Sequence, residues 1–249
     1  MMIRRSVVAV AALALASTVF ARAADAPKPL RTLVYAVQFS AQTRNAEQTS
    51  GFTGSDTGPQ STGVGHGLVE RSSTVSDDGT LTVDVVGASA DAGLVVDASY
   101  TGKNSAQAPV RVAIYPDGRL AFDPLKPLSP QAARLLPLLA RGFVAGRDVS
   151  AGSTWKTEVA APAKGTVTYR VSEIQGEVAT IAIDGEIKVV GARGYDEVDH
   201  GTTRYATDRL CPVSYDLTAR SRHQPTADQT VTENAHLTAT LVSDTFAKK

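Results

Sequence analysis

The sequence predicts a mainly β protein: a curved antiparallel sheet or open barrel, or two packed sheets, with one kinked, leucine-rich helix. Three observations predict this fold class. Apolar and polar residues alternate along most of the chain, which is typical of strands with one buried face. The intervening positions are rich in Thr and Ser, which suit strands and hydrogen-bond to water. Only residues 130–141 replace this alternation with helical spacing.

The first element of the chain has the features of a secretory signal peptide, residues 1–23. A short basic start, Met1–Arg5, precedes an apolar run over residues 6–20 and the small-residue exit Ala-Arg-Ala at 21–23. The run is too short to span a bilayer. We expect cleavage near Ala23 and a periplasmic or secreted protein.

The remaining chain is long enough for one domain with a large core. The sequence has 249 residues, of which 43% are hydrophobic, and this excludes a wholly disordered chain. We expect a single β-rich domain over residues 24–249, with no membrane helix after processing, because no later stretch approaches about 20 apolar residues. Basic and acidic residues number 25 each, so the charge does not favour nucleic acid as a partner. A signal peptide with no disulfide pair fits a bacterial periplasm.

The predicted strands fall into two groups, residues 31–125 and 153–245, which the helical segment separates. In each strand an apolar residue takes every second place, so that one row of side chains faces a core. The predicted strands cover Leu33–Ala41, Leu81–Val85, Leu94–Tyr100, Val110–Ile114, Trp155–Val159, Val167–Val171, Ala179–Ile183, Val213–Ala219 and Ala235–Leu241.

Glycine-containing turns connect these strands. The Pro-Asp-Gly sequence within Tyr115–Arg119 predicts a hairpin, and we expect further bends at Asp77–Gly79 and Gln175–Gly176. Asp184–Gly185 predicts either a two-residue hairpin or a bulge within one long strand. Residues 43–67 contain many glycines among Ser, Thr and Asn, and this composition predicts a flexible or irregular loop.

The helix is predicted over residues 130–141. Ser129 is suited to cap it, Pro130 to occupy its first position, and Gly142 to end it. Pro137 removes a backbone hydrogen bond in the middle and should kink the helix. One apolar stripe runs along it and beyond its end: Ala132, Leu135, Leu136, Leu139 and Phe143.

This stripe suggests the candidate ligand-contacting residues Leu135, Leu136, Leu139, Phe143 and Trp155. Trp155 opens the strand that follows the helix and is the only Trp of the chain. These side chains could line an apolar cavity between sheet and helix, or the helix could simply plug the concave face of the sheet. The two interpretations differ in whether space remains inside.

No pattern in the sequence predicts catalysis, a cofactor or a metal. Residues 63–67 contain three glycines but lack the strand and helix that a phosphate-binding loop needs. Tyr195–His200 concentrates three acidic residues and one His, and we interpret it as a solvated acidic surface loop rather than a metal site. No Gly-x-Ser-x-Gly motif accompanies the four widely separated His residues, His66, His200, His223 and His236.

Three smaller features also receive an interpretation, and for two of them there are two alternatives. His236 alternates with apolar neighbours and is expected to face solvent on a strand. The basic residues within Arg220–His223 could meet an anionic surface or serve solubility. Cys211 lies among apolar residues and is interpreted as a small buried hydrophobe rather than a reactive thiol or a link to a partner chain.

The order of these elements resembles that of the periplasmic lipoprotein carriers, which have an incomplete β-barrel covered by helices. The resemblance rests on the signal peptide, the amphipathic strands and the leucine-rich helix, and it implies an apolar, lipid-like ligand. The Gly-x-Thr-Trp sequence at 152–155 also resembles exported bacterial β proteins without assigned function.

Two functions are therefore expected. The first is an exported periplasmic binding or carrier protein for a lipid-like ligand. The alternative is an envelope structural or assembly protein that acts on another envelope protein through its surface and edge strands, with no small-molecule site.

Overall fold

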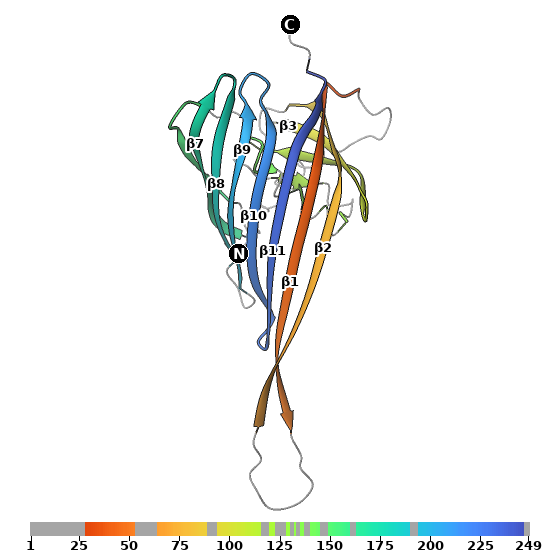
Figure 1. Cartoon of the computed structure of the whole chain (residues 1–249), viewed down its shortest axis with the longest axis vertical. Coiled ribbons are helices and arrows are strands. Elements are labelled where there is room, and N and C mark those ends of the chain that lie inside the picture. Colours follow the sequence, from red (N-terminus) through yellow and green to blue (C-terminus); the bar gives the residue numbers. More distant parts are fainter. Residues whose placement is uncertain are drawn as a thin grey trace, which may run out of the picture.

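In the part of the chain that the structure describes, eleven antiparallel strands form one continuous sheet (Figure 1). Each strand pairs with neighbours in the order β5-β4-β3-β2-β1-β11-β10-β9-β8-β7-β6. The first and last strands of the chain therefore lie side by side in the middle of the sheet, and its two edges, β5 and β6, come from the middle of the sequence. The strands are β1 (Arg31–Phe52), β2 (Val64–Gly87), β3 (Leu94–Gly102), β4 (Ala106–Ile114), β5 (Leu120–Phe122), β6 (Thr154–Glu158), β7 (Ala163–Gln175), β8 (Val178–Val189), β9 (Tyr195–Ala206), β10 (Cys211–Thr226) and β11 (Gln229–Asp244).

This computed structural model describes most of the chain beyond the predicted signal peptide, which lies outside the described residues. The described residues are 28–52, 64–88, 94–115, 120–122, 128–129, 132, 135–136, 140–144, 149–159, 163–189 and 194–246. Within them, no helix is long and apolar enough to cross a membrane.

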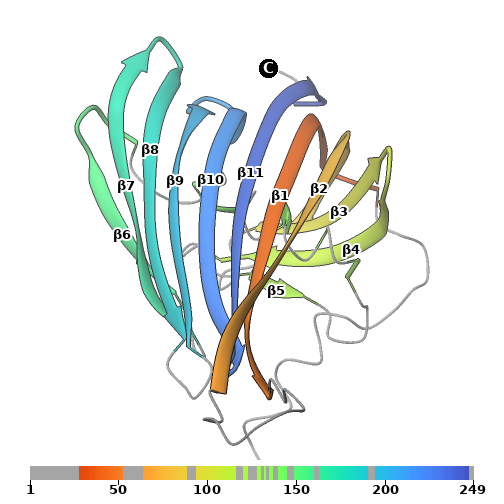
Figure 2. The same cartoon turned by 60° about the horizontal axis from the view of Figure 1, so that its bottom comes forward.

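The prediction of a mainly β, antiparallel fold is confirmed, and the sheet is single and curved rather than split into two packed sheets (Figure 2). The predicted kinked helix at 130–141 stays a prediction, because no continuous helix is defined among the described residues and Pro137 lies outside them. Isolated residues of this segment do have helical backbone conformation: Ala132, Leu135, Leu136 and Ala140.

The core lies on the concave face of the sheet, where every second side chain of the strands points. In β1, for example, Leu33, Tyr35 and Val37 are each 1% exposed, as their alternation predicted. Burial of such a side chain contributes roughly 1.5–3 kcal/mol to folding. The described residues of the range 128–144, which are 128–129, 132, 135–136 and 140–144 and which we call the crossing segment, pack on this face and contribute Leu135 and Phe143 to the same apolar cluster.

One of the predicted turns is wrong, because its Asp-Gly pair lies inside a long strand. Asp77–Gly79 belongs to β2 and pairs with residues 37–39 of β1. A Cβ atom on Gly79 would lie 2.5 Å from the carbonyl oxygen of Thr101, so glycine is needed there for close packing and not for a bend. Asp184–Gly185 likewise lies within β8, which agrees with one long strand rather than a hairpin.

Other turn predictions are confirmed. Gln175 and Gly176 connect β7 to β8, and Gly176 has the positive φ of 60° that favours glycine. Strands β4 and β5 pair antiparallel as expected, although residues 116–119 between them lie outside the described residues. The predicted irregular loop at 43–67 is wrong at both ends, because β1 continues to Phe52 and β2 begins at Val64.

Candidate functional site

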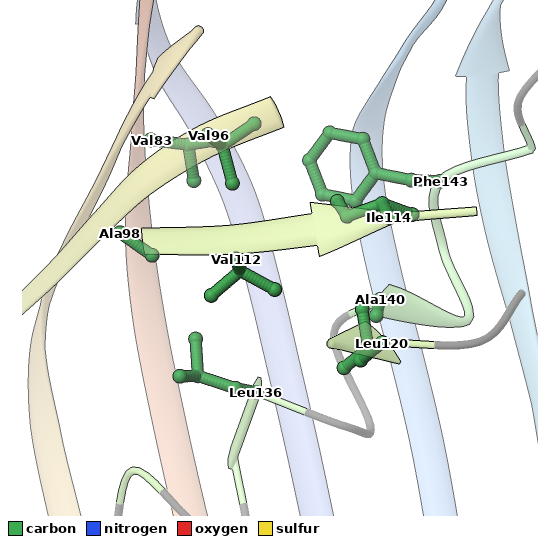
Figure 3. A pocket seen from close by; sticks show the side chains of 9 residues that line it. All are labelled: Val83, Val96, Ala98, Val112, Ile114, Leu120, Leu136, Ala140 and Phe143. Atoms are coloured by element: carbon green, nitrogen blue, oxygen red, sulfur yellow. The ribbon is translucent and has the colours of Figure 1, made fainter. Parts of the chain in front are cut away.

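The first candidate site is a small apolar cavity under the crossing segment (Figure 3). Its volume is about 20 Å³, close to the space of one water molecule, whereas pockets for small ligands enclose about 300–1,000 Å³. The cavity as it stands has no space for an acyl chain. Nine apolar residues of β2–β5 and the crossing segment line it: Val83, Val96, Ala98, Val112, Ile114, Leu120, Leu136, Ala140 and Phe143.

The predicted ligand-contacting residues do not share this cavity. Leu136 and Phe143 line it, but Leu135, 2% exposed, packs in the core outside it. Trp155 lies on β6 at the opposite edge of the sheet from β5, and its ring stacks on Tyr169 with centroids 5.3 Å apart. Leu139 is outside the described residues. The arrangement of the described residues agrees with a crossing segment that fills the concave face.

Two aromatic side chains fasten the crossing segment to the sheet. The hydroxyl of Tyr205 on β9 donates a hydrogen bond to the carbonyl of Val144 at 3.0 Å. The ring of Tyr35 on β1 meets Phe143 edge to face, with centroids 6.3 Å apart. Each contact joins this segment to a different part of the sheet, so that β1 and β9 both hold it in place.

The second candidate site is a buried charge cluster on the inner face of β9. The prediction of an acidic surface loop at Tyr195–His200 is wrong, because these residues form a strand whose side chains alternate between two faces. Glu197 and Asp199 point inward, toward Arg141 of the crossing segment. Arg141 Nη2 lies 2.7 Å from Glu197 Oε1, and Nη1 contacts a carboxylate oxygen of Asp199.

Burial makes this cluster a strong constraint on the crossing segment. Asp199 is 0% exposed, and its neighbour across the strand pair is Gly185, where a Cβ atom would lie 2.6 Å from the Asp199 carboxylate. Tyr195 donates a hydrogen bond to Glu197. Burial, together with that carboxylate, raises the pKa of Tyr195 above its ordinary value, which keeps the phenol a donor. These contacts hold the crossing segment against β9.

The described residues bring together no group of three or more His, Cys, Asp or Glu side chains that could hold a metal ion. Two histidines lie exposed on the convex face, each beside one carboxylate. His200 Nδ1 is 2.8 Å from Asp184 Oδ1, and His236 Nε2 is 3.1 Å from Asp216 Oδ1. His236 thus faces solvent, as its alternation predicted.

Cys211 is buried, as expected from its apolar neighbours. Its sulfur accepts a hydrogen bond from Arg31 Nη2 at 3.2 Å, a contact between residues 180 positions apart that local sequence could not reveal. Burial raises the pKa of the Cys211 thiol, and the charge of Arg31 opposes this shift only in part. The structure therefore describes an unreactive thiol.

The third candidate site is a feature that the sequence analysis missed, a strand pair that extends beyond the sheet (Figure 1). Strand β11 pairs with β1 only as far as Glu47. Residues 48–52 and 64–68, which we call the projecting ribbon, pair as strands only with each other. The high glycine content around residues 51–67 concealed this pairing in the sequence.

The same region leaves one side of β2 without a neighbouring strand. Strand β3 pairs with β2 only from Gly79 onward. Residues 68–75 of β2, which we call the free edge, have no strand beside them in the described part of the chain. Their side chains are exposed on both faces as far as Thr74, and they include two exposed apolar residues, Leu68 and Val69, at 65% and 39%.

Comparison with known proteins assigns none of these sites. No protein-family model matches the sequence, and no curated protein matches it.

Proposed function

We propose that the protein is exported to the bacterial envelope and acts there as an assembly protein, which binds an extended segment of another polypeptide along its free edge. The observation that carries this proposal is the eight-residue strand edge at 68–75, which has no described strand on the side away from β1 and whose side chains are exposed as far as Thr74. An extended peptide that adds to such an edge gains main-chain hydrogen bonds along its length.

The energetics of the projecting ribbon support the same function. A two-stranded ribbon without a packed face is only marginally stable in water, and the side chains of residues 68–74 that continue it along β2 are exposed. An added strand would satisfy the open backbone groups of the free edge and would cover the exposed Leu68 and Val69. The charged neighbours Glu70 and Arg71 discourage indiscriminate pairing at this edge.

The interior supports this function over a carrier function. A cavity of about 20 Å³ leaves no space for a lipid chain unless the crossing segment moves. That segment is tied to the sheet by Arg141 and by the Tyr205 hydrogen bond to Val144. The accessible surface of the protein is therefore the better candidate for its binding activity.

The proposal is tested by placing a photo-reactive amino acid at Leu68, with Val242 as the matched control. Val242 is 67% exposed on β11, so the two positions are equally accessible. We expect a discrete cross-linked partner in the producing cell from position 68 and none from 242. A synthetic peptide of the cross-linked partner segment should then bind the purified protein and slow hydrogen exchange of the amides at 68–75. A peptide that binds without protecting these amides would contradict the proposal.

A second candidate function is transport of a lipid-like ligand, and the wholly apolar lining of the cavity favours it. Displacement of the crossing segment would uncover a concave apolar surface, with Leu136 and Phe143 on the moving part. The predicted helix at 130–141 would then act as the cover of the ligand site, as in the periplasmic lipoprotein carriers.

Mass spectrometry of gently purified protein separates the two functions. Co-purifying lipid that is lost in a folded Leu136→Arg variant would establish transport. Repeated ligand-free preparations, together with unfolding of Leu136→Arg, would show that Leu136 only fills the core.

A further inference from the structure

A polar groove of about 500 Å³ crosses the outer face of the sheet near the base of the projecting ribbon. It spans β2, β1, β11 and β10, the four strands at the centre of the molecule. Its lining alternates with the core: Ala41 points inward on β1, whereas Gln42 and Arg44 point outward into the groove. The groove is thus separate from the apolar cavity, and it borders the free edge at residues 70–72.

Cross-strand register brings the lining side chains together from distant parts of the sequence. Gln42 of β1 lies opposite Asn234 of β11, which in turn lies opposite Arg220 of β10. One step along the strands, Arg44 lies opposite both Ser72 of β2 and Thr232 of β11. Directly opposed residues have Cβ atoms about 4.5–5.5 Å apart, so these groups can meet one ligand.

The charge of the groove is positive. Arg44 and Arg220 point into it, against the single carboxylate of Glu70. Glu70 forms an ion pair with Arg44. Arg71 also borders the groove, but it alternates with Glu70 and Ser72 along β2, so its side chain points to the other face. Arg220 forms no ion pair with any other described residue, so its guanidinium group remains available to an anion.

We propose that this groove binds a small hydroxylated oxyanion, a sugar that carries a carboxylate or a phosphate. A guanidinium group such as that of Arg220 binds both kinds of oxyanion through paired hydrogen bonds. The amides of Gln42 and Asn234 both donate and accept hydrogen bonds, which matches the hydroxyls of a sugar ring. The volume of about 500 Å³ lies within the range of small-ligand sites, and its polar lining disfavours an apolar ligand.

The test is a calorimetric titration of the purified chain with four probes: glucose 6-phosphate, glucuronate, inorganic phosphate and glucose. We expect at least one anionic sugar to bind more tightly than both inorganic phosphate and glucose. Binding of only glucose 6-phosphate would identify the phosphate as the recognised group, and binding of only glucuronate would identify the carboxylate. Equal affinity for inorganic phosphate and the anionic sugars, or no binding of either sugar, would overturn the proposal.

Matched arginine variants locate the binding. Arg220→Gln should weaken the anionic sugar at least tenfold, whereas Arg204→Gln should change its affinity less than twofold. Arg204 is also exposed on the outer face, on β9, but it does not line the groove. Equal effects of the two variants would show that general surface charge attracts the ligand and would overturn the proposal. Loss of the groove ligand would leave cross-linking at position 68 unaffected, so the two proposals fail independently.

Discussion

Arg141→Met should remove about 3–5 kcal/mol from the free energy of unfolding, the usual cost of leaving a buried charge without its partner. The structure explains why the cost should be high. Asp199 is 0% exposed, and neither of its carboxylate oxygens has a hydrogen-bond partner in the described part of the chain. Arg141 is its only ion-pair partner there and also pairs with Glu197, whose side chain is 15% exposed. Met keeps the unbranched aliphatic part of the side chain but removes its charge.

This loss is large beside the total stability of a typical domain, about 5–15 kcal/mol. Urea unfolding followed by Trp155 fluorescence and by circular dichroism measures it, because Trp155 stacks on Tyr169 only in the folded sheet. Arg204→Met, which removes an exposed charge from the same sheet, is the control and should change stability by less than about 0.5 kcal/mol. Addition of Asp199→Asn to Arg141→Met should recover more than half of the loss. A loss below about 1 kcal/mol for Arg141→Met, with an unchanged urea dependence, would refute the argument that Asp199 is charged and buried.

Three further predictions concern other positions. Gly79→Ala should destabilise the protein by about 1–3 kcal/mol, because its Cβ atom would lie 2.5 Å from a backbone oxygen. Gly87→Ala should be tolerated, because its Cβ atom would have no other atom within 4 Å. Equal urea midpoints for the two variants would contradict this prediction. Burial alone would raise the pKa of Asp77, but hydrogen bonds from Ser105 and from nearby backbone amides hold it below the ordinary value of 3.8. The wild-type protein should therefore be more stable than the Asp77→Asn variant at neutral pH, and this difference in stability should shrink as the pH falls below about 4. If the urea midpoints of the two proteins differ as much at pH 3 as at pH 7, the prediction is wrong. Cys211 should react with a maleimide far more slowly in native protein than in urea, since burial raises its pKa, and equal rates would show that the thiol is accessible.

The alternation of apolar residues was sufficient to predict the strands, because one face of nearly every strand meets the same core. Leu33, Tyr35 and Val37 illustrate this, since their spacing alone identifies the buried row. Sequence also placed Leu135, Leu136 and Phe143 on one apolar stripe, without deciding between a cavity wall and a plug, and the structure buries all three in that core. It did not locate the cavity, whose walls come from β2–β5 as well as from the crossing segment.

The errors share one physical cause: a polar or glycine residue takes its role from partners far away in the chain. Asp199 was interpreted as solvated, yet Arg141, 58 positions earlier, neutralises it inside the protein. Gly79 was interpreted as a turn residue, yet it is required by the approach of Thr101 in the next strand. The groove arginines gave no local pattern because they come from β1, β2 and β10, which only the sheet order brings together.

The placement of β11 has a consequence for how the chain can be assembled. Strands β1–β5 form one half of the sheet and β6–β10 the other, and β11 alone bridges them through its pairing with β1 and β10. The bridge is made by the strand that follows both halves along the chain, and the bidentate pairing of Arg31 with Asp244 across it spans 213 positions of sequence. Contacts of such separation slow folding, so the two five-stranded halves stay unjoined until β11 takes its place between them. Loss of β11 alone would therefore divide the sheet into two, with new open edges at β1 and β10.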